Sequence, residues 1–182
     1  MNLLVTLLQI HTPEYVRKRA LSQLFKFTVA AFGCDVPPIL TLSSDECLLQ
    51  YALFTQSHVE GLIRDGRDLE TVQHCLYQNA VELGKMHGKR LRIHTIEDTM
   101  AIGRVLYRIL GIEFQGNAQG EVVIRRCHFS RFYSSQVCQI MSAMDRGLFA
   151  GLSNGGQLDF SSRITEGQPY CRAHFALWED TK

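Results

Sequence analysis

The stretch GIEFQGNAQGEVVIRRCHF, residues 111–129, marks the point at which the chain changes its secondary structure. Upstream of it, apolar residues recur with the spacing of amphipathic helices. Downstream, short runs rich in β-branched residues are separated by turn-forming residues. We expect strands at 113–115 and 121–129, joined by a turn over 117–120. The chain therefore predicts a helical N-terminal part followed by an α+β part.

Start and stop signals divide the N-terminal part into four expected helices. Pro13 and Gly33 suit the two ends of the first helix. Ser43 and the acidic residues that follow it suit the start of the second. A capping box beginning at Thr95 opens the fourth. The helices are expected at about 14–32, 45–64, 69–88 and 95–110.

The C-terminal part continues with one helix and a second pair of strands. The helix is expected at about 136–152, capped by Ser134 or Ser135, and the strands at 158–165 and 170–178 with a turn between them. Short, turn-linked strands pair antiparallel, with helices covering one face. We therefore predict a single α+β domain over 1–182, with the element order ααααββαββ. Its helical part spans about 1–111 and its ββαββ part about 112–180.

The composition and net charge of the chain argue against several classes of function. The chain has 182 residues, 46% of them hydrophobic and 20% charged, which is typical of a globular domain. A net charge of +1 provides no field that would attract nucleic acid or an anionic membrane. The opening MNLLVTLLQI lacks the basic region of a secretory signal, and no apolar stretch approaches the roughly 20 residues of a membrane span. We expect a cytoplasmic protein with six reduced cysteines, no nucleic-acid partner and no membrane partner.

The last third of the chain concentrates the residues capable of chemistry. Three of the six cysteines lie there: Cys127, Cys138 and Cys171. Strand alternation places Cys127 on the side of Val123 and Arg125. We expect Cys127 and Cys171 both to face the helical layer, where Cys138 also points.

Three inward thiols fit a packed core, a catalytic nucleophile or a metal site. Packing is the commonest role of a free cysteine, and we assign it to Cys34, Cys47 and Cys75. Zinc sites usually contain close pairs such as C-x2-C, and this chain has none. A zinc ion would need the three late thiols and a fourth ligand to converge, which no spacing supports. We therefore predict no cofactor.

A carboxylate shares a helix with one of these thiols. Asp145 lies two turns after Cys138, with Met141 between them on the same line of the helix. An aspartate beside an apolar stripe needs a partner, because burying an unpaired carboxylate is costly. Asp145 could form a structural ion pair with an arginine, or it could serve as a general base or orient a thiol or imidazole. Arginines from the strands could in turn hold an anionic substrate or form surface ion pairs: Arg125, Arg163 and Arg172.

Several of these features occur together in a known family. They are a cysteine closing a strand, a helix carrying Cys138 and Asp145, and a strand leading into Gly167–Cys171 with Phe175 after it. In this arrangement residues 122–175 resemble the C-terminal signature of the L-2-amino-thiazoline-4-carboxylic acid hydrolase family. That family commonly has an acid after the glycine, where this chain has Gln168.

The resemblance implies hydrolysis of a C–N bond in a small cyclic amidine that carries a carboxylate. It implies that Cys127 or Cys171 adds covalently, or that Asp145 activates water while the thiols line the pocket. His128 and His174 would shuttle protons near neutral pH. The residues expected to hold the substrate are Cys138, Arg125, Arg163 and Arg172.

The element order also resembles the 4-vinyl reductase domain, a small-molecule-binding fold shared with TRAPP-type trafficking proteins. Some of its members bind zinc through a spaced Cys and E-x2-C-x7-C. Counting back from Cys171, this chain has Arg163 and Phe160 at the intermediate positions, which argues against that zinc site. This resemblance implies a homodimer, and its functional alternatives are a non-catalytic sensor or carrier of a small molecule and an assembly module. Whether the protein is an enzyme is thus left open by the sequence.

Overall fold

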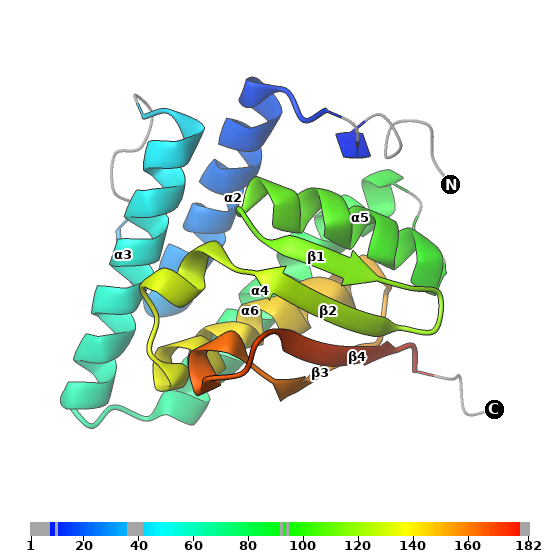
Figure 1. The fold of residues 1–182 in the computed structure, drawn as a ribbon. Coiled ribbons are helices and arrows are strands. Elements are labelled where there is room, and N and C mark those ends of the chain that lie inside the picture. The colour runs from blue at the N-terminus through cyan, green and yellow to red at the C-terminus, as the bar shows by residue number, and fades with distance from the viewer. Residues whose placement is uncertain (1–7, 10, 36–41, 92, 94, 179–182) are drawn as a thin grey trace.

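The computed structural model confirms the α+β fold (Figure 1) and describes residues 8–9, 11–35, 42–91, 93 and 95–178. Most of residues 1–10, on which the expectation of no secretory signal depends, lie outside this part. Within it, the elements follow the predicted order of four helices, two strands, a helix and two strands. They are α2 (Glu14–Phe32), α3 (Ser44–Arg64), α4 (Leu69–Leu91), α5 (Ile96–Ile109), β1 (Glu113–Gly116), β2 (Glu121–Arg126), α6 (Ser135–Leu152), β3 (Gln157–Ser162) and β4 (Cys171–Ala176), with short 3-10 turns η1 (His128–Arg131) and η2 (Ile164–Glu166).

The helix starts follow from their capping residues. Ser43 forms a complete capping box with Glu46, which satisfies backbone donors on both sides of the cap. The Thr95 side chain accepts a hydrogen bond from the Asp98 backbone, and Ser134 caps α6 in the same way. α4 continues to Leu91, past the expected stop at Gly88. Local capping signals therefore located the starts of α3, α5 and α6.

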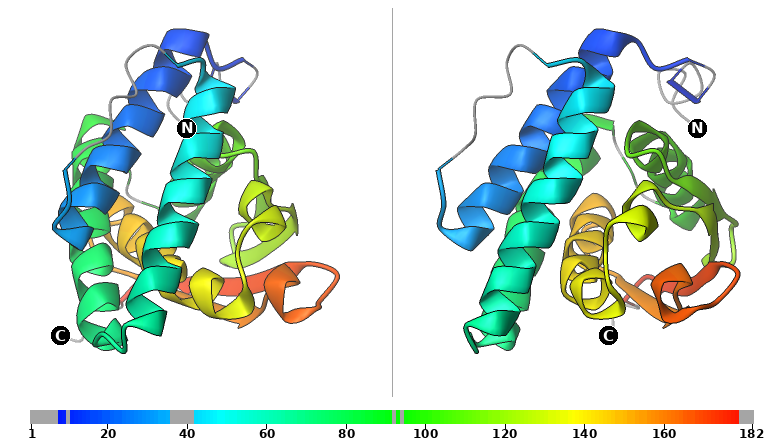
Figure 2. Two further views of the ribbon diagram at one scale, coloured as in Figure 1. Left: turned by 90° about the vertical axis from the view of Figure 1, so that its left-hand side faces the viewer. Right: turned by 60° about the vertical axis from the view of Figure 1, so that its left-hand side comes forward.

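The described strands form one antiparallel sheet in the order β1-β2-β4-β3. Val122 and Ile124 of β2 lie opposite Ala173 and Cys171 of β4, and all four are buried against the helices. Their neighbours along the strands alternate to the other face, which is largely exposed. Figures 1 and 2 show the helices gathered on one side of the sheet, with α6 between it and α4.

Two of the expected strands end three residues early. The strand predicted to reach residue 129 stops at Arg126, and the one predicted to reach residue 165 stops at Ser162. In both places a 3-10 turn follows within two residues. These turns carry the chain from the sheet toward the helical layer. They therefore bring the residues between strand and turn next to α6.

A β-bulge in β2 changes which side chains face the core. Glu113 pairs with Arg126, whereas the next residue of β1, Phe114, pairs with Ile124, so Arg125 is an extra residue in β2. Arg125 and Arg126 are both exposed, and the alternation is shifted by one residue after them. The predicted grouping of Cys127 with Val123 and Arg125 is therefore wrong. Cys127 faces the helical layer, as expected, only because the bulge turns it inward.

Helices α4 and α6 approach each other through glycines on both. A Cβ atom on Gly84 would lie 2.4 Å from the Leu148 carbonyl oxygen, and one on Gly151 would lie 2.2 Å from the Val81 carbonyl oxygen. Gly147 is equally confined, with 2.2 Å between its Cβ position and the Tyr77 oxygen. Since real Cβ atoms are not found at such distances from backbone, only glycine permits this separation of the two helices.

Within residues 8–9, 11–35, 42–91, 93 and 95–178, no helix has the length and apolar character of a membrane span.

We predict that Gly147→Ala lowers the free energy of unfolding by about 2 kcal/mol or more, because the added methyl group forces α4 and α6 apart. Denaturant titration followed by circular dichroism measures this change. Gly61→Ala on α3 is the matched control, since its Cβ would meet only the end of the Arg64 side chain, at 3.6 Å. The control should gain about 0.5–1 kcal/mol from the better helix propensity of alanine. Equal effects of the two substitutions would contradict the packing argument.

Candidate functional site

A cavity of about 100 Å³ lies between α6, the inner face of the sheet and the N-terminal helices. Its wall is mainly aliphatic and aromatic. The chain segments that form it are far apart in the sequence, from α2 to β4. The lining residues are Leu24, Tyr51, Ala80, Leu83, Tyr107, Leu110, Ile112, Ile124, Cys127, Phe129, Tyr133, Cys138, Met141, Ser142, Met144, Asp145, Leu148, Phe160, Arg163 and Cys171.

The structure brings five of the nine predicted site residues to this cavity. Cys138 and Asp145 project from α6, as their spacing predicted. Cys171 comes from the start of β4, and Cys127 from the segment just after the bulge in β2. Arg163 enters from the residue that precedes η2. Three thiols, a carboxylate and a guanidinium thus share one cavity.

Asp145 is held by a tyrosine from a different helix. The Tyr107 hydroxyl of α5 donates a hydrogen bond to Asp145 Oδ1 at 2.5 Å. Burial raises the pKa of Asp145 to about 6, although the Tyr107 hydrogen bond and the charges of Arg163 and Arg146 act to lower it. Among the described residues no cationic side chain lies within ion-pair distance, 4.0 Å, of this carboxylate. Of the two alternatives for Asp145, the structural ion pair with an arginine is therefore not formed, and the partner is a phenol.

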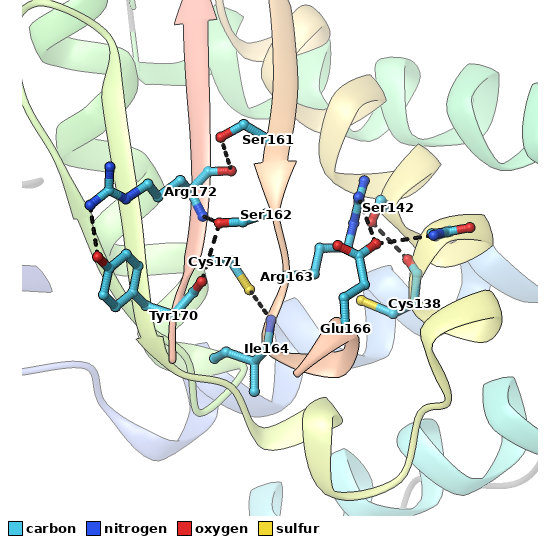
Figure 3. Close-up of polar contacts among 11 residues, drawn as sticks. Cys138, Ser142, Ser161, Ser162, Arg163, Ile164, Glu166, Tyr170, Cys171 and Arg172 are labelled. Carbon is cyan, nitrogen blue, oxygen red and sulfur yellow. Dashed lines mark hydrogen bonds and ion pairs between the residues drawn. The ribbon is translucent and has the colours of Figure 1, made fainter. Parts of the chain in front are cut away.

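Arg163 is fixed by interactions at the edge of the cavity (Figure 3). Its Nη1 atom lies 3.3 Å from Glu166 Oε1, which also accepts a hydrogen bond from Gln139 at 3.0 Å. The guanidinium stands 5.0 Å over the centre of the Phe160 ring, and the Arg163 side chain is only 18% exposed. The buried Nε atom has no hydrogen-bond partner. The positive charge of Arg163 is therefore largely matched by Glu166 before any ligand arrives.

Burial keeps the three thiols protonated. It raises the pKa of Cys127 to about 12 and raises the pKa values of Cys138 and Cys171 as well. The backbone N–H of Ile164 donates to Cys171 Sγ at 3.4 Å, which opposes this shift only in part (Figure 3). Because the thiolate is the nucleophilic form, thiols in this state are unreactive at neutral pH.

Tyrosines are the lining residues that the sequence analysis missed. The Tyr51 hydroxyl lies 3.0 Å from the Thr28 hydroxyl, and the Tyr133 hydroxyl lies 2.5 Å from that of Thr55. With Tyr107 bound to Asp145, all three phenol groups have partners within the protein. Their rings, rather than their hydroxyls, are thus available to a ligand. A tyrosine within an apolar helical stripe is the signal that could have identified them, since a buried phenol needs a polar partner.

The other four predicted residues lie outside the cavity. His174 and Arg172 alternate to the exposed face of β4, where Arg172 bonds the Tyr170 hydroxyl at 2.7 Å. Arg125 is exposed at the bulge. His128 begins η1, packs against Phe132, and has a pKa lowered by its burial and by the charge of Arg131. The expected proton shuttles and two of the expected arginine anchors are therefore not brought to the site.

Within the described part of the chain, no three side chains of the types His, Cys, Asp or Glu are grouped so as to hold a metal ion. The thiols share the cavity without forming a ligand set.

Comparison with known proteins identifies no relative of this chain. No protein-family model matches the chain, and no curated protein or solved structure matches it. The two family resemblances drawn from residues 122–175 and from the element order thus stay predictions. Any functional conclusion must come from the geometry of the cavity.

The raised pKa of Asp145 predicts a specific dependence of stability on pH. A carboxyl group with a higher pKa in the folded state than in the unfolded state favours folding when protonated and opposes it when ionised. The wild type should therefore lose about 2 kcal/mol relative to Asp145→Asn as the pH rises from 4 to 7. Urea unfolding at a series of pH values measures this difference. Asp159→Asn, on the exposed side of β3, is the control and should follow the wild type. Parallel profiles for the wild type and Asp145→Asn would contradict the assignment.

Proposed function

We propose that the protein binds a small ring-shaped molecule in the cavity between α6 and the sheet, without chemical change. The observation that carries the proposal is the lining: twenty residues from separate elements line one mostly apolar space, partly open to the surface, with very few charged groups. A stably folded core normally closes such a space, because each unfilled volume forfeits dispersion contacts. A ligand would restore those contacts.

The size of the space limits the ligand. A protein cavity of roughly 150 Å³ is large enough to hold benzene. A cavity of about 100 Å³ therefore suits a five-membered ring better than a six-membered one. The protonated thiols support a role as weakly polar wall groups, since they add polarisable sulfur without adding charge.

We expect at least one of three five-membered rings, pyrrolidine, tetrahydrofuran or thiophene, to bind the wild type with a dissociation constant in the range of about 1 mM. Saturation-transfer NMR and thermal-shift titration measure the binding. Cys171→Leu should abolish it, because the leucine side chain occupies the cavity from the start of β4. Cys75→Leu on α4, which does not line the cavity, should bind like the wild type. The proposal fails if the wild type binds none of the three rings.

A second candidate function is hydrolysis of a cyclic amidine, and the state of Asp145 favours it. A carboxyl group with a pKa of about 6 is suited to act as a general base and then as an acid near neutral pH. Asp145 would take a proton from water while the water oxygen adds to the ring carbon between nitrogen and sulfur. That proton passes to the ring nitrogen as its C=N bond becomes single. Asp145 then takes the remaining hydroxyl proton and passes it to the same nitrogen as the C–N bond breaks and the C=O bond forms. The buried Nε atom of Arg163 would hold the substrate carboxylate.

Incubation with 2-amino-thiazoline-4-carboxylate separates the two functions. Hydrolysis predicts a product heavier by one water molecule, formed by the wild type and not by Asp145→Asn, as measured by mass spectrometry. Asp159→Asn, a substitution outside both the cavity lining and the contacts of Arg163, is the control and should retain turnover. Saturable binding with unchanged substrate would leave binding as the function and exclude this reaction.

A further inference from the structure

We infer that the cavity selects a small organic cation, whose N–H group binds the carboxylate of Asp145 while its ring packs against the tyrosine rings of the wall. This inference rests on the proposed binding function and specifies the chemical class of the ligand.

The first support is the charge distribution in the cavity. Asp145 and Arg163 are the only lining residues with a formal charge in the described structure. Arg163 has an acidic partner in Glu166 and a ring beneath its guanidinium, whereas Asp145 has no cation within ion-pair distance. Arg146, the next residue along α6, lines a separate cleft beside Trp178 and not this cavity. The negative charge of Asp145 therefore has no positive partner within ion-pair distance among the described residues that line the cavity.

The second support is the hydrogen bonding of the carboxylate itself. Tyr107 donates to Oδ1, and no described residue donates a hydrogen bond to Oδ2. An ionised carboxylate can accept about four hydrogen bonds. Tyr107 also fixes the orientation of the group, so the remaining acceptor positions are directed before a ligand arrives. An ammonium or amidinium group would supply both the donors and the charge.

The third support is the wall around the carboxylate. The rings of Tyr51, Tyr107, Phe129 and Tyr133 line the cavity, and Phe129 packs between two of the tyrosines at centroid distances of 5.9 and 5.3 Å. The hydroxyl groups of the tyrosines are already bound to protein partners. Aromatic faces attract cations through the ring quadrupole, and the attraction is strongest where water is excluded.

The ionisation of Asp145 makes the binding dependent on pH. Other titratable or charged groups lie in or beside the cavity on α3, α5, the segment after β2, the segment before α6, α6, the segment before η2 and β4: Tyr51, Tyr107, Cys127, Tyr133, Cys138, Arg146, Arg163 and Cys171. Burial raises the pKa values of the three thiols and the three tyrosines, so these stay neutral near pH 7. Asp145, with a pKa of about 6, is the group that changes charge. A bound cation stabilises its ionised form.

Pyrrolidine and tetrahydrofuran test the inference, because the rings have the same size and differ in the cationic N–H group. With the full chain at pH 7.5, we expect pyrrolidine to bind at least about tenfold more tightly than tetrahydrofuran. Below pH 6 its affinity should fall by up to about tenfold per pH unit as Asp145 is protonated. Asp145→Asn should lose both the preference and the pH dependence, and Asp159→Asn should keep both. Isothermal titration calorimetry and saturation-transfer NMR measure the affinities, and circular dichroism checks the fold of each variant.

The outcomes distinguish the inference from the function on which it rests. If tetrahydrofuran binds as tightly as pyrrolidine, the cavity is a binding site but the selection of a cation is overturned. The same holds if Asp145→Asn retains the preference for pyrrolidine. If pyrrolidine, tetrahydrofuran and thiophene all fail to bind, both proposals are overturned. Cyclobutanecarboxylate, an anion of similar size, should bind more weakly than either ring, and tighter binding would also overturn the inference.

Discussion

The close contact between α4 and α6 constrains everything else in this structure. Where Gly84 faces Gly151, backbone meets backbone without intervening side chains, so α6 cannot slide or rotate without a clash. One side of α6 packs against α4 in this contact. Its other side, with Cys138, Met141 and Asp145, must therefore face the sheet. The position of the cavity follows because α4 holds one side of α6 rigidly. The opposite side of α6 meets a sheet that carries both large and small side chains.

The half-buried carboxylate of Asp145 is the energetically unfavourable feature of this arrangement. A core of the same shape with an apolar residue at position 145 would avoid the desolvation that raises the pKa of Asp145. The Tyr107 hydrogen bond offsets this cost only in part, and the charges of Arg163 and Arg146 act from a greater distance. Groups kept in an unfavourable environment tend to mark functional sites, because the environment tunes them for a ligand or a reaction. Both the binding and the hydrolytic proposals use this one group.

The two proposals require different protonation states of the thiols. A nucleophilic role for Cys127 would require its proton to leave in a site that raises the pKa to about 12. A role as wall groups requires nothing further. Arg163 fits either proposal, since its ion pair with Glu166 and its contact with Phe160 hold it at the cavity edge. The geometry therefore favours the binding proposal, in which the carboxylate is the contact that we assign to the ligand.

Local signals in the sequence determined most of the secondary structure, because caps and alternation act over a few residues. Ser43, Thr95 and Ser134 cap helices where they were expected to, and the buried face of β4 follows from its alternation. Helical spacing likewise placed Cys138 and Asp145 on one line. Tertiary structure decided the rest. The bulge at Arg125 depends on pairing with β1, and Tyr107 meets Asp145 across 38 residues of sequence. Such contacts are set by the packing of whole elements, which no short stretch of sequence encodes by itself.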